Sequence, residues 1–457
     1  MKILLSIFNF ICAKISEKKT FKVLLLSVIS FSSIISFKNI TFNLYFNSVY
    51  KEYAEFIKSL DFNVFSEPGI TFPIWGYGFI HLLGENILLV LLIQQALTLY
   101  SLLYLDRILI KYDLIKRIDL FRISLLLSLP WFLFHTQMWP KSIASNLLLI
   151  GVLLVIEYLK TNNSSKLLFS SFLFGLLHNF RPDYLYLSIV LYFLIIIFTN
   201  KRNYKTFCFP LIQYIMLIPW MIFTFHQTGK AIPTSSNAGH VFFIGLGQLP
   251  NNIWGITPVD EDPEKIKILT AEFGPNFKSD NHKEDMFLKQ KFKEYVIKNP
   301  GEWVKKCFYA FRLLALDPFF VGNVGNFQQN KISNIKEIRK LESNFYEMKF
   351  KENLSLIKQT KWDFSYAEVF QLIITVYTKI YGIMLFAAFL ILFLIIAVKG
   401  KFKNILNSVD VILLIIIGYQ MSISIFAFHM PVYNTSIYIF YLLMTNLLFQ
   451  KYLSIKQ

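Results

Sequence analysis

Long runs of apolar residues recur along the chain, separated by short polar connections. Several runs reach the roughly 20 residues that an α-helix needs to cross the hydrocarbon core of a bilayer. The pattern therefore predicts an all-α polytopic membrane protein with about ten spanning helices. We place these spans near residues 20–37, 86–105, 119–134, 143–159, 166–179, 184–199, 207–226, 370–398, 409–428 and 435–450.

Two further segments have helical patterns outside the spans. Residues 1–19 combine apolar side chains with four lysines, and we interpret them as a helix lying on the membrane surface. A second helical stretch runs from about His282 to Leu316 and ends at Asp317-Pro318. It is expected to end there because proline cannot continue the helical hydrogen bonds.

Lysines and arginines accumulate in alternate connections between the predicted spans. The intervening short connections hold only Lys141 and Arg181. Cytoplasmic loops are enriched in basic residues, so we expect both termini in the cytoplasm. The basic connections contain Arg107, Lys111, Lys116 and Arg117, then Lys160 and Lys166, then Lys201, Arg202 and Lys205, then Lys399, Lys401 and Lys403.

This topology divides the chain into three parts. Residues 1–226 form an N-terminal transmembrane module whose first outer loop, 38–85, is partly helical. Residues 227–366 form a large extracytoplasmic loop, the only stretch long enough for a small subdomain outside the membrane. Residues 367–457 contain the C-terminal transmembrane helices.

Composition agrees with a bilayer as the solvent of this chain. Hydrophobic residues make up 55% and charged residues only 16%, with a mean hydropathy of +0.48. Soluble domains are about 25% charged. The net charge of +17 follows the predicted topology and is suited to anionic lipid, so we do not predict a nucleic-acid partner.

The usual motifs of soluble enzymes are absent from the sequence. The three cysteines, Cys12, Cys208 and Cys307, have no metal-ligand spacing and predict no disulfide framework. The histidines are scattered, and Thr228-Gly229-Lys230 lacks the first glycine of a phosphate loop. We therefore predict neither a metal nor a cofactor.

Polar residues at the outer ends of spans are the main chemical signal. Arg181-Pro182-Asp183 interrupts an apolar stretch from 167 to 198, so two short helices should meet there. Charged groups at membrane depth are costly and often functional. The alternative is a tight turn in which Arg181 and Asp183 pair and Pro182 begins a helix. Tyr433 lies at another outer turn, where an interfacial aromatic is the simpler interpretation.

The first outer loop contains a second candidate site. On a helix, Asn47, Tyr50 and Ala54 would share one face because they are three and four residues apart. Glu52 and Glu55 would point elsewhere. They are either solvated carboxylates or, in a functional interpretation, a carboxylate above a membrane-level pocket that takes a proton from an acceptor hydroxyl.

These features together resemble the GT-C membrane glycosyltransferases, in particular the bacterial protein O-mannosyltransferase-like and aminoarabinose-transferase-like (family 39-like) branch. Four stretches carry the resemblance, in order along the chain. They are Asn47 to Ala54 with Phe72-Pro73-Ile74-Trp75; Phe180-Arg181-Pro182-Asp183; Ile218-Pro219-Trp220 with Thr228-Gly229-Lys230 and Ile232 to Gly245; and Tyr295 to Pro300 with the helix of Arg312.

The resemblance implies a location in a bacterial inner (plasma) membrane and metal-independent transfer of a sugar from a polyprenyl-phosphate donor to a glycan, lipid or protein acceptor. A carboxylate would deprotonate the acceptor, and cations would stabilise the phosphate leaving group. Arg181, Lys230, His240 and Lys141 are the candidates for the phosphate, with Tyr50 as a further substrate contact.

The sequence departs from the family at one important position. The expected catalytic aspartate is Asn47, and an amide cannot act as a general base. Glu52 or Glu55 could supply the base after a local shift, or Asp183 or Asp260 from another loop. Otherwise the chain has lost transferase chemistry. Alternative functions are another envelope-polysaccharide enzyme, such as a polymerase or ligase, or a non-catalytic membrane protein or lipid-linked glycan transporter.

Overall fold

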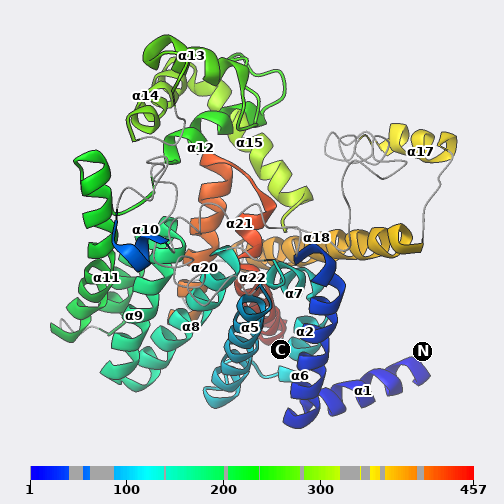
Figure 1. Ribbon diagram of the computed structural model, residues 1–457. Coiled ribbons are helices and arrows are strands. Elements are labelled where there is room, and N and C mark those ends of the chain that lie inside the picture. The colour runs from blue at the N-terminus through cyan, green and yellow to red at the C-terminus, as the bar shows by residue number, and fades with distance from the viewer. Residues whose placement is uncertain are drawn as a thin grey trace.

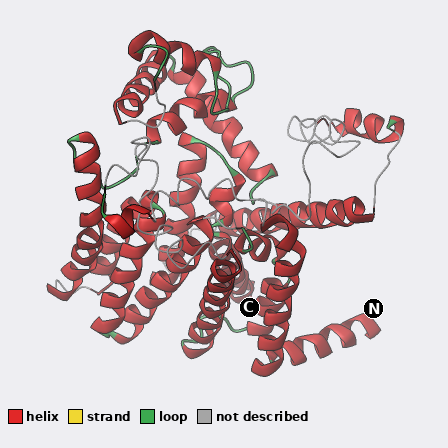
Figure 2. Cartoon of the chain, viewed as in Figure 1, coloured by secondary structure: helices red, strands yellow, loops and turns green. Residues whose placement is uncertain are grey.

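The computed structural model describes residues 2–40, 55–61, 87–137, 140–199, 204–235, 237–277, 282–319, 340, 350–360, 366–398 and 406–456. Every element among these residues is helical, and no strand occurs in them (Figure 2). The helices form a bundle, and a smaller group of helices stands at one end of it (Figure 1). The prediction of an all-α protein is confirmed.

Six helical segments of the described chain are long and apolar enough to cross a membrane. They lie in α5 (Ile87–Lys111), α8 (Pro140–Thr161), η3 with α10 (Pro182–Tyr184, Leu185–Thr199), α11 (Tyr204–Thr228), α18 (Tyr366–Val398), and α20 with η5 (Ser408–Ser422, Ile423–Ala427). The chain is thus a multi-pass membrane protein, as the apolar pattern predicted.

A seventh span is formed if α6 (Ile118–Leu126) and α7 (Leu129–His135) are counted together. They are bent by 55° at the break, where Pro130 enters the first turn of α7. Helices α2 (Lys18–Ile40), α9 (Ser164–Phe180) and α22 (Tyr438–Lys456) also match predicted spans but fall short in length or apolar character. The total of ten therefore remains a prediction.

The N-terminal segment is helical, as the sequence predicted. Helix α1 (Lys2–Ser16) turns away from α2 at the lower edge of the bundle (Figure 1). Arg122 on α6 holds this corner: its guanidinium donates to the backbone carbonyl of Ser16 at 2.6 Å and pairs with Asp106 on α5 at 2.7 Å. Both charged side chains of that pair are buried.

The group of helices above the bundle comes from the predicted large outer loop (Figure 1). It contains α12 (Ala238–Gly245), η4 (Leu246–Gln248), α13 (Pro263–Phe273), α14 (His282–Lys298) and α15 (Pro300–Leu316). A small core of Phe243, Leu246, Ile256, Leu269 and Leu288 holds it together. The predicted helix from His282 to Leu316 is confirmed, with a break where Pro300 begins α15.

The last helices return the chain to the centre of the bundle. The short α21 (Pro431–Thr435) connects α20 and η5 to α22, which packs beside α18 and α20. In Figure 1, α18 runs across the view at a steep angle to α5 and α8, and α17 (Phe350–Gln359) lies apart from the bundle. In Figure 1, α21 lies at the junction of the bundle with α12–α15, and it contacts α7 and α20.

Candidate functional site

Two cations from different helices meet on one aromatic ring at this junction. The ammonium nitrogen of Lys141, in the first turn of α8, lies 4.7 Å from the centre of the Tyr433 ring. The guanidinium carbon of Arg181, just after α9, lies 5.2 Å from the same centre. The face of an aromatic ring is electron-rich and attracts cations. Tyr433 therefore holds together two like charges that would otherwise repel each other.

The local sequence explains why Arg181 lies at this point. Pro182 has no N–H and disfavours a helical conformation in the residue before it, so α9 ends at Phe180 and Arg181 is extended. Pro431 begins α21 in the same way. Pro182 thus places Arg181 directly after the end of α9, and Pro431 places Tyr433 within the short α21.

Asp183 is hydrogen-bonded to Arg181 within this turn and to Tyr419 on α20. Its carboxylate accepts from both Nε, at 2.8 Å, and Nη2 of Arg181. Its backbone carbonyl accepts from the hydroxyl of Tyr419 on α20. The Arg181 side chain is 12% exposed and that of Asp183 30%. The pairing is the one expected for the alternative interpretation of this segment, a tight turn with Pro182 at the start of a helix.

A second polar group includes Asp260, in the loop before α13. Burial raises the pKa of the Tyr433 hydroxyl; Arg181 opposes this, while Asp183 and Asp260 add to it. The Asp260 side chain is 88% exposed, unlike that of Asp183.

His240 on α12 positions the Asp260 carboxylate. Its Nε2 lies 3.0 Å from Oδ1 of Asp260, and its Nδ1 lies 3.3 Å from Nζ of Lys265. A lysine ammonium can only donate, so Nδ1 is the acceptor and Nε2–H donates to Asp260. Lys265 also donates to the Asp260 backbone carbonyl. Hydrogen bonds thus hold both the side chain and the backbone of Asp260.

The same loop is fixed below α13 by Asp262. This buried residue caps the helix by accepting from Lys265 N–H at 2.7 Å, and its other oxygen accepts from the backbone N–H and hydroxyl of Thr257 at 2.6 and 2.7 Å. An aspartate followed by proline at the first helical position is a strong helix start. The position of Asp260 is consequently set two residues before a rigid helix end.

Two polar side chains, Lys306 and Gln248, attach the outer helices to the membrane part. Lys306 of α15 donates to the carbonyls of Ile425 and Ala427 in η5, at 3.0 and 2.7 Å. The side-chain amide of Gln248 exchanges two hydrogen bonds of 2.9 Å with the backbone of His429. Burial lowers the pKa of Lys306 to about 8 and that of His429 to about 4.

The chain matches no protein-family model, no curated protein and no solved structure. The resemblance to the GT-C transferases accordingly stays a prediction from the sequence.

The structure brings together some of the predicted site residues and separates others. Lys141, Arg181 and Asp183 form one cluster with Tyr433, and His240 contacts Asp260. Lys230 is exposed, and its described contacts are with Thr228 and, electrostatically, His282. The candidates Asn47, Tyr50 and Glu52 lie outside the described residues.

His240 makes two contacts that the sequence did not predict. Its ring nitrogens contact Asp260 and Lys265. The sequence analysis also treated Tyr433 as an interfacial aromatic and did not foresee its two cations. The hints in the sequence were Pro140 before Lys141, Pro182 after Arg181 and Pro431 before Tyr433. Within the described residues, no group of three or more His, Cys, Asp or Glu side chains could hold a metal ion.

Proposed function

We propose that this chain is a membrane glycosyltransferase that moves a sugar from a polyprenyl-phosphate donor to an envelope acceptor at the side where α12–α15 stand. The pairing of Lys141 and Arg181 on Tyr433 carries this proposal. Two basic side chains that meet on one ring suit an anionic phosphate, and arginine binds phosphate oxygens in a fixed two-pronged geometry. Their location at the ends of membrane helices suits a phosphate attached to a lipid.

Asp260 is the best candidate for the base among the described carboxylates. Asp183 is paired with Arg181, whereas Asp260 is exposed and has an oxygen beyond the one that accepts from His240. This assignment supplies a carboxylate despite Asn47. Glu52 remains the competing candidate, since it belongs to the stretch that resembles the first outer loop of the family.

The proposed step is a single displacement at the anomeric carbon. Asp260 takes the proton of the acceptor hydroxyl while that oxygen forms a bond to the anomeric carbon. The bond from this carbon to the phosphate oxygen breaks, and its electron pair leaves with the polyprenyl phosphate. Arg181 and Lys141 stabilise the charge that develops on the leaving oxygen. The sugar is transferred with inversion.

The test is sugar transfer by the full-length protein in lipid nanodiscs. A panel of polyprenyl-phosphate sugars is supplied with crude envelope acceptors, and release of free polyprenyl phosphate is followed. We expect release by the wild type and at least a hundredfold slower release by Asp260→Asn. Glu261→Gln is the matched control, because this neighbouring carboxylate is also exposed and should leave the rate unchanged.

Two further variants separate the roles of the candidates. Arg181→Gln should weaken donor use, and Glu52→Gln should leave the rate unchanged. If Glu52→Gln abolishes release while Asp260→Asn does not, the base is in the first outer loop. Absence of release from every donor by the folded wild-type protein, with acceptors from several envelopes, would count against a transferase and in favour of a non-catalytic or transport function.

A further inference from the structure

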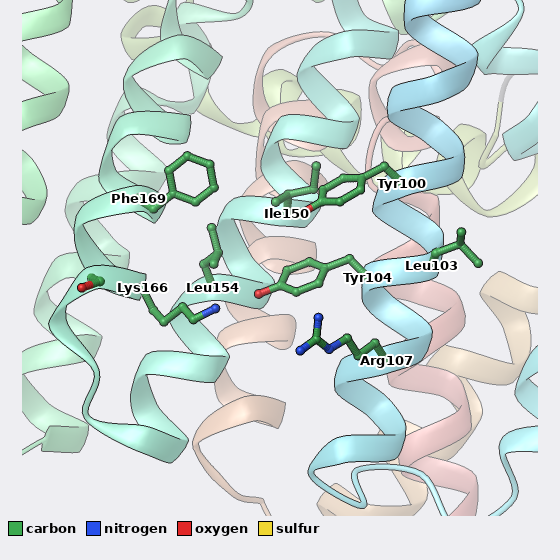
Figure 3. Close-up of a pocket in the computed structure, with 9 residues that line it drawn as sticks. Tyr100, Leu103, Tyr104, Arg107, Ile150, Leu154, Lys166 and Phe169 are labelled. Atoms are coloured by element: carbon green, nitrogen blue, oxygen red, sulfur yellow. The ribbon is translucent and has the colours of Figure 1, made fainter.

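A cavity of about 460 Å³ opens between α5, α8 and α9, at the opposite end of the bundle from Tyr433. Figure 3 shows the polar ends of Tyr104, Arg107 and Lys166 turned toward one another in its lower part, with Phe169 and Ile150 above them. The volume is within the range of about 300–1,000 Å³ that is usual for small-molecule sites. The proposed transfer reaction makes no use of this cavity.

At the floor of the cavity, a hydrogen bond and two ion pairs surround one buried carboxylate. Glu157, whose side chain is 4% exposed, accepts from Tyr104 at 2.6 Å and pairs with Lys111 at 2.7 Å and Lys166 at 2.9 Å. These contacts neutralise Glu157 and fix Tyr104 and Lys166 in place. The cavity lining therefore has a defined geometry before any ligand enters.

Arg107 is a basic residue of the cavity lining that does not belong to the network around Glu157. It is exposed and makes no ion pair with any described carboxylate, since Asp106 beside it is paired with Arg122. Arg107, Lys111 and Lys166 against Glu157 are three positive charges to one negative charge. The excess of two positive charges favours an anion, and arginine with tyrosine beside it provides several hydrogen-bond donors.

The upper part of the cavity has a different character. Tyr100 on α5 and Phe169 on α9 are half exposed, at 55% and 50%, and Phe172 continues the apolar surface of α9 at 44%. In a membrane these side chains face lipid. A soluble phosphate would use only the basic floor, whereas a phospholipid would use the floor with its headgroup and the apolar walls with its chains.

We propose that this cavity binds the phosphate headgroup of an anionic phospholipid, with the acyl chains along the apolar surface of α5 and α9. Basic pockets between membrane helices are suited to such headgroups. Glu157 lies 16 residues from Lys141 on α8, which corresponds to about 24 Å along the helix. The lipid site is therefore separate from the Tyr433 cluster, and its test does not depend on transferase activity.

The experiment uses the full-length protein in mixed nanodiscs of phosphatidylcholine and phosphatidylglycerol with matched acyl chains. Native mass spectrometry then counts the lipids that remain bound after detergent release. We expect the wild type to retain phosphatidylglycerol over phosphatidylcholine. Arg107→Gln should lower that preference about tenfold, the loss expected for one charge-assisted contact. Lys166→Gln should do the same, but it also breaks a pair with Glu157, so Arg107→Gln is the decisive variant.

Lys160→Gln is the matched control. It removes the same charge from an exposed position at the same end of α8, outside the cavity lining. An equal loss of preference in Lys160→Gln would mean general surface attraction and would overturn the proposal. So would equal retention of both lipids by the wild type. Inorganic phosphate in excess should not displace the retained lipid, and displacement would assign the cavity to a free anion instead.

Discussion

The guanidinium of Arg181 lies against the face of the Tyr433 ring, 5.2 Å from its centre, while the edge of the same guanidinium is bonded to Asp183. One planar cation thus uses its face and its edge for different partners, which a lysine at this position could not do. Lys141 reaches the ring separately. The cluster keeps two basic side chains close to each other, one at the start of α8 and one just after the end of the next helix, α9.

The aromatic ring, not the hydroxyl of Tyr433, should be what stabilises this cluster. Each cation contributes about 0.5–2 kcal/mol through the ring. We expect Tyr433→Leu to lower the free energy of unfolding by about 2 kcal/mol, and Tyr433→Phe to lower it by much less. Unfolding by titration with sodium dodecyl sulfate in mixed micelles measures both. Equal losses in the two variants would assign the stabilisation to the hydroxyl.

The ion pair in the turn should be strongly coupled. Removing one partner leaves a largely buried charge unpaired, at a cost of about 3 kcal/mol. We expect Arg181→Ala and Asp183→Ala each to be destabilised by that order, and the double variant to be clearly more stable than the sum of the two losses. A double-mutant cycle in the same micelles gives the coupling. Additive losses would mean that the two side chains do not interact in the membrane.

The local part of this arrangement was predictable from sequence. Apolar run lengths gave the helices, and Arg181-Pro182-Asp183 indicated both a break and a charged turn, because proline acts on its immediate neighbours. Likewise, Pro300 divides the predicted stretch from His282 to Leu316 into two helices. Signals of this kind depend on a few adjacent residues.

The long-range part was not predictable in the same way. Tyr433 meets Arg181 across about 250 positions, and no local pattern indicates which outer turn packs against which. His240 was a plausible cation as an isolated residue, and only the positions of Asp260 and Lys265 show that both of its nitrogens are occupied. Buried charges such as Glu157 were hidden in apolar runs for the same reason.

Lys306 should make the attachment of α15 dependent on pH. Burial lowers its pKa in the folded protein to about 8 from an ordinary value of 10.5. Between these values the unfolded chain binds more protons, so stability rises as the pH increases through this range. We expect a gain of up to about 3 kcal/mol from pH 8 to 10.5.

The contribution of Lys306 is isolated by comparison with Lys306→Met. This variant keeps a long apolar side chain but cannot titrate, so the difference in unfolding free energy between it and the wild type should change over this range. Other groups that titrate there cancel in the difference. A difference that stays constant from pH 8 to 10.5 would show that the ammonium stays charged against its three carbonyl acceptors.

His240 should act on transfer only through the position of Asp260. Because its Nε2–H holds Oδ1 of Asp260, we expect His240→Ala to lower kcat about tenfold while KM for the donor stays nearly unchanged. His240→Gln, which keeps a donor at a similar reach, should recover part of the rate. A large increase in KM with unchanged kcat would indicate that His240 contacts the donor phosphate after all.

Gly245 should be essential for seating the outer helices on the membrane part. A Cβ at this position would lie 2.1 Å from the carbonyl oxygen of Ala427, the same oxygen that accepts from Lys306 at 2.7 Å. Gly245→Ala must therefore push α12 away from η5 and disturb the lysine contact with it. We expect a loss of about 3 kcal/mol in unfolding free energy, within the range for overpacked sites.

Gly418→Ala is the matched control on α20, where no atom lies within 4 Å of the added carbon. This change should stabilise the helix by about 0.5–1 kcal/mol. If both variants behave alike, α12 does not pack against Ala427 at Gly245. Another contact must then hold the outer helices, and Asp260 with them, against the membrane part.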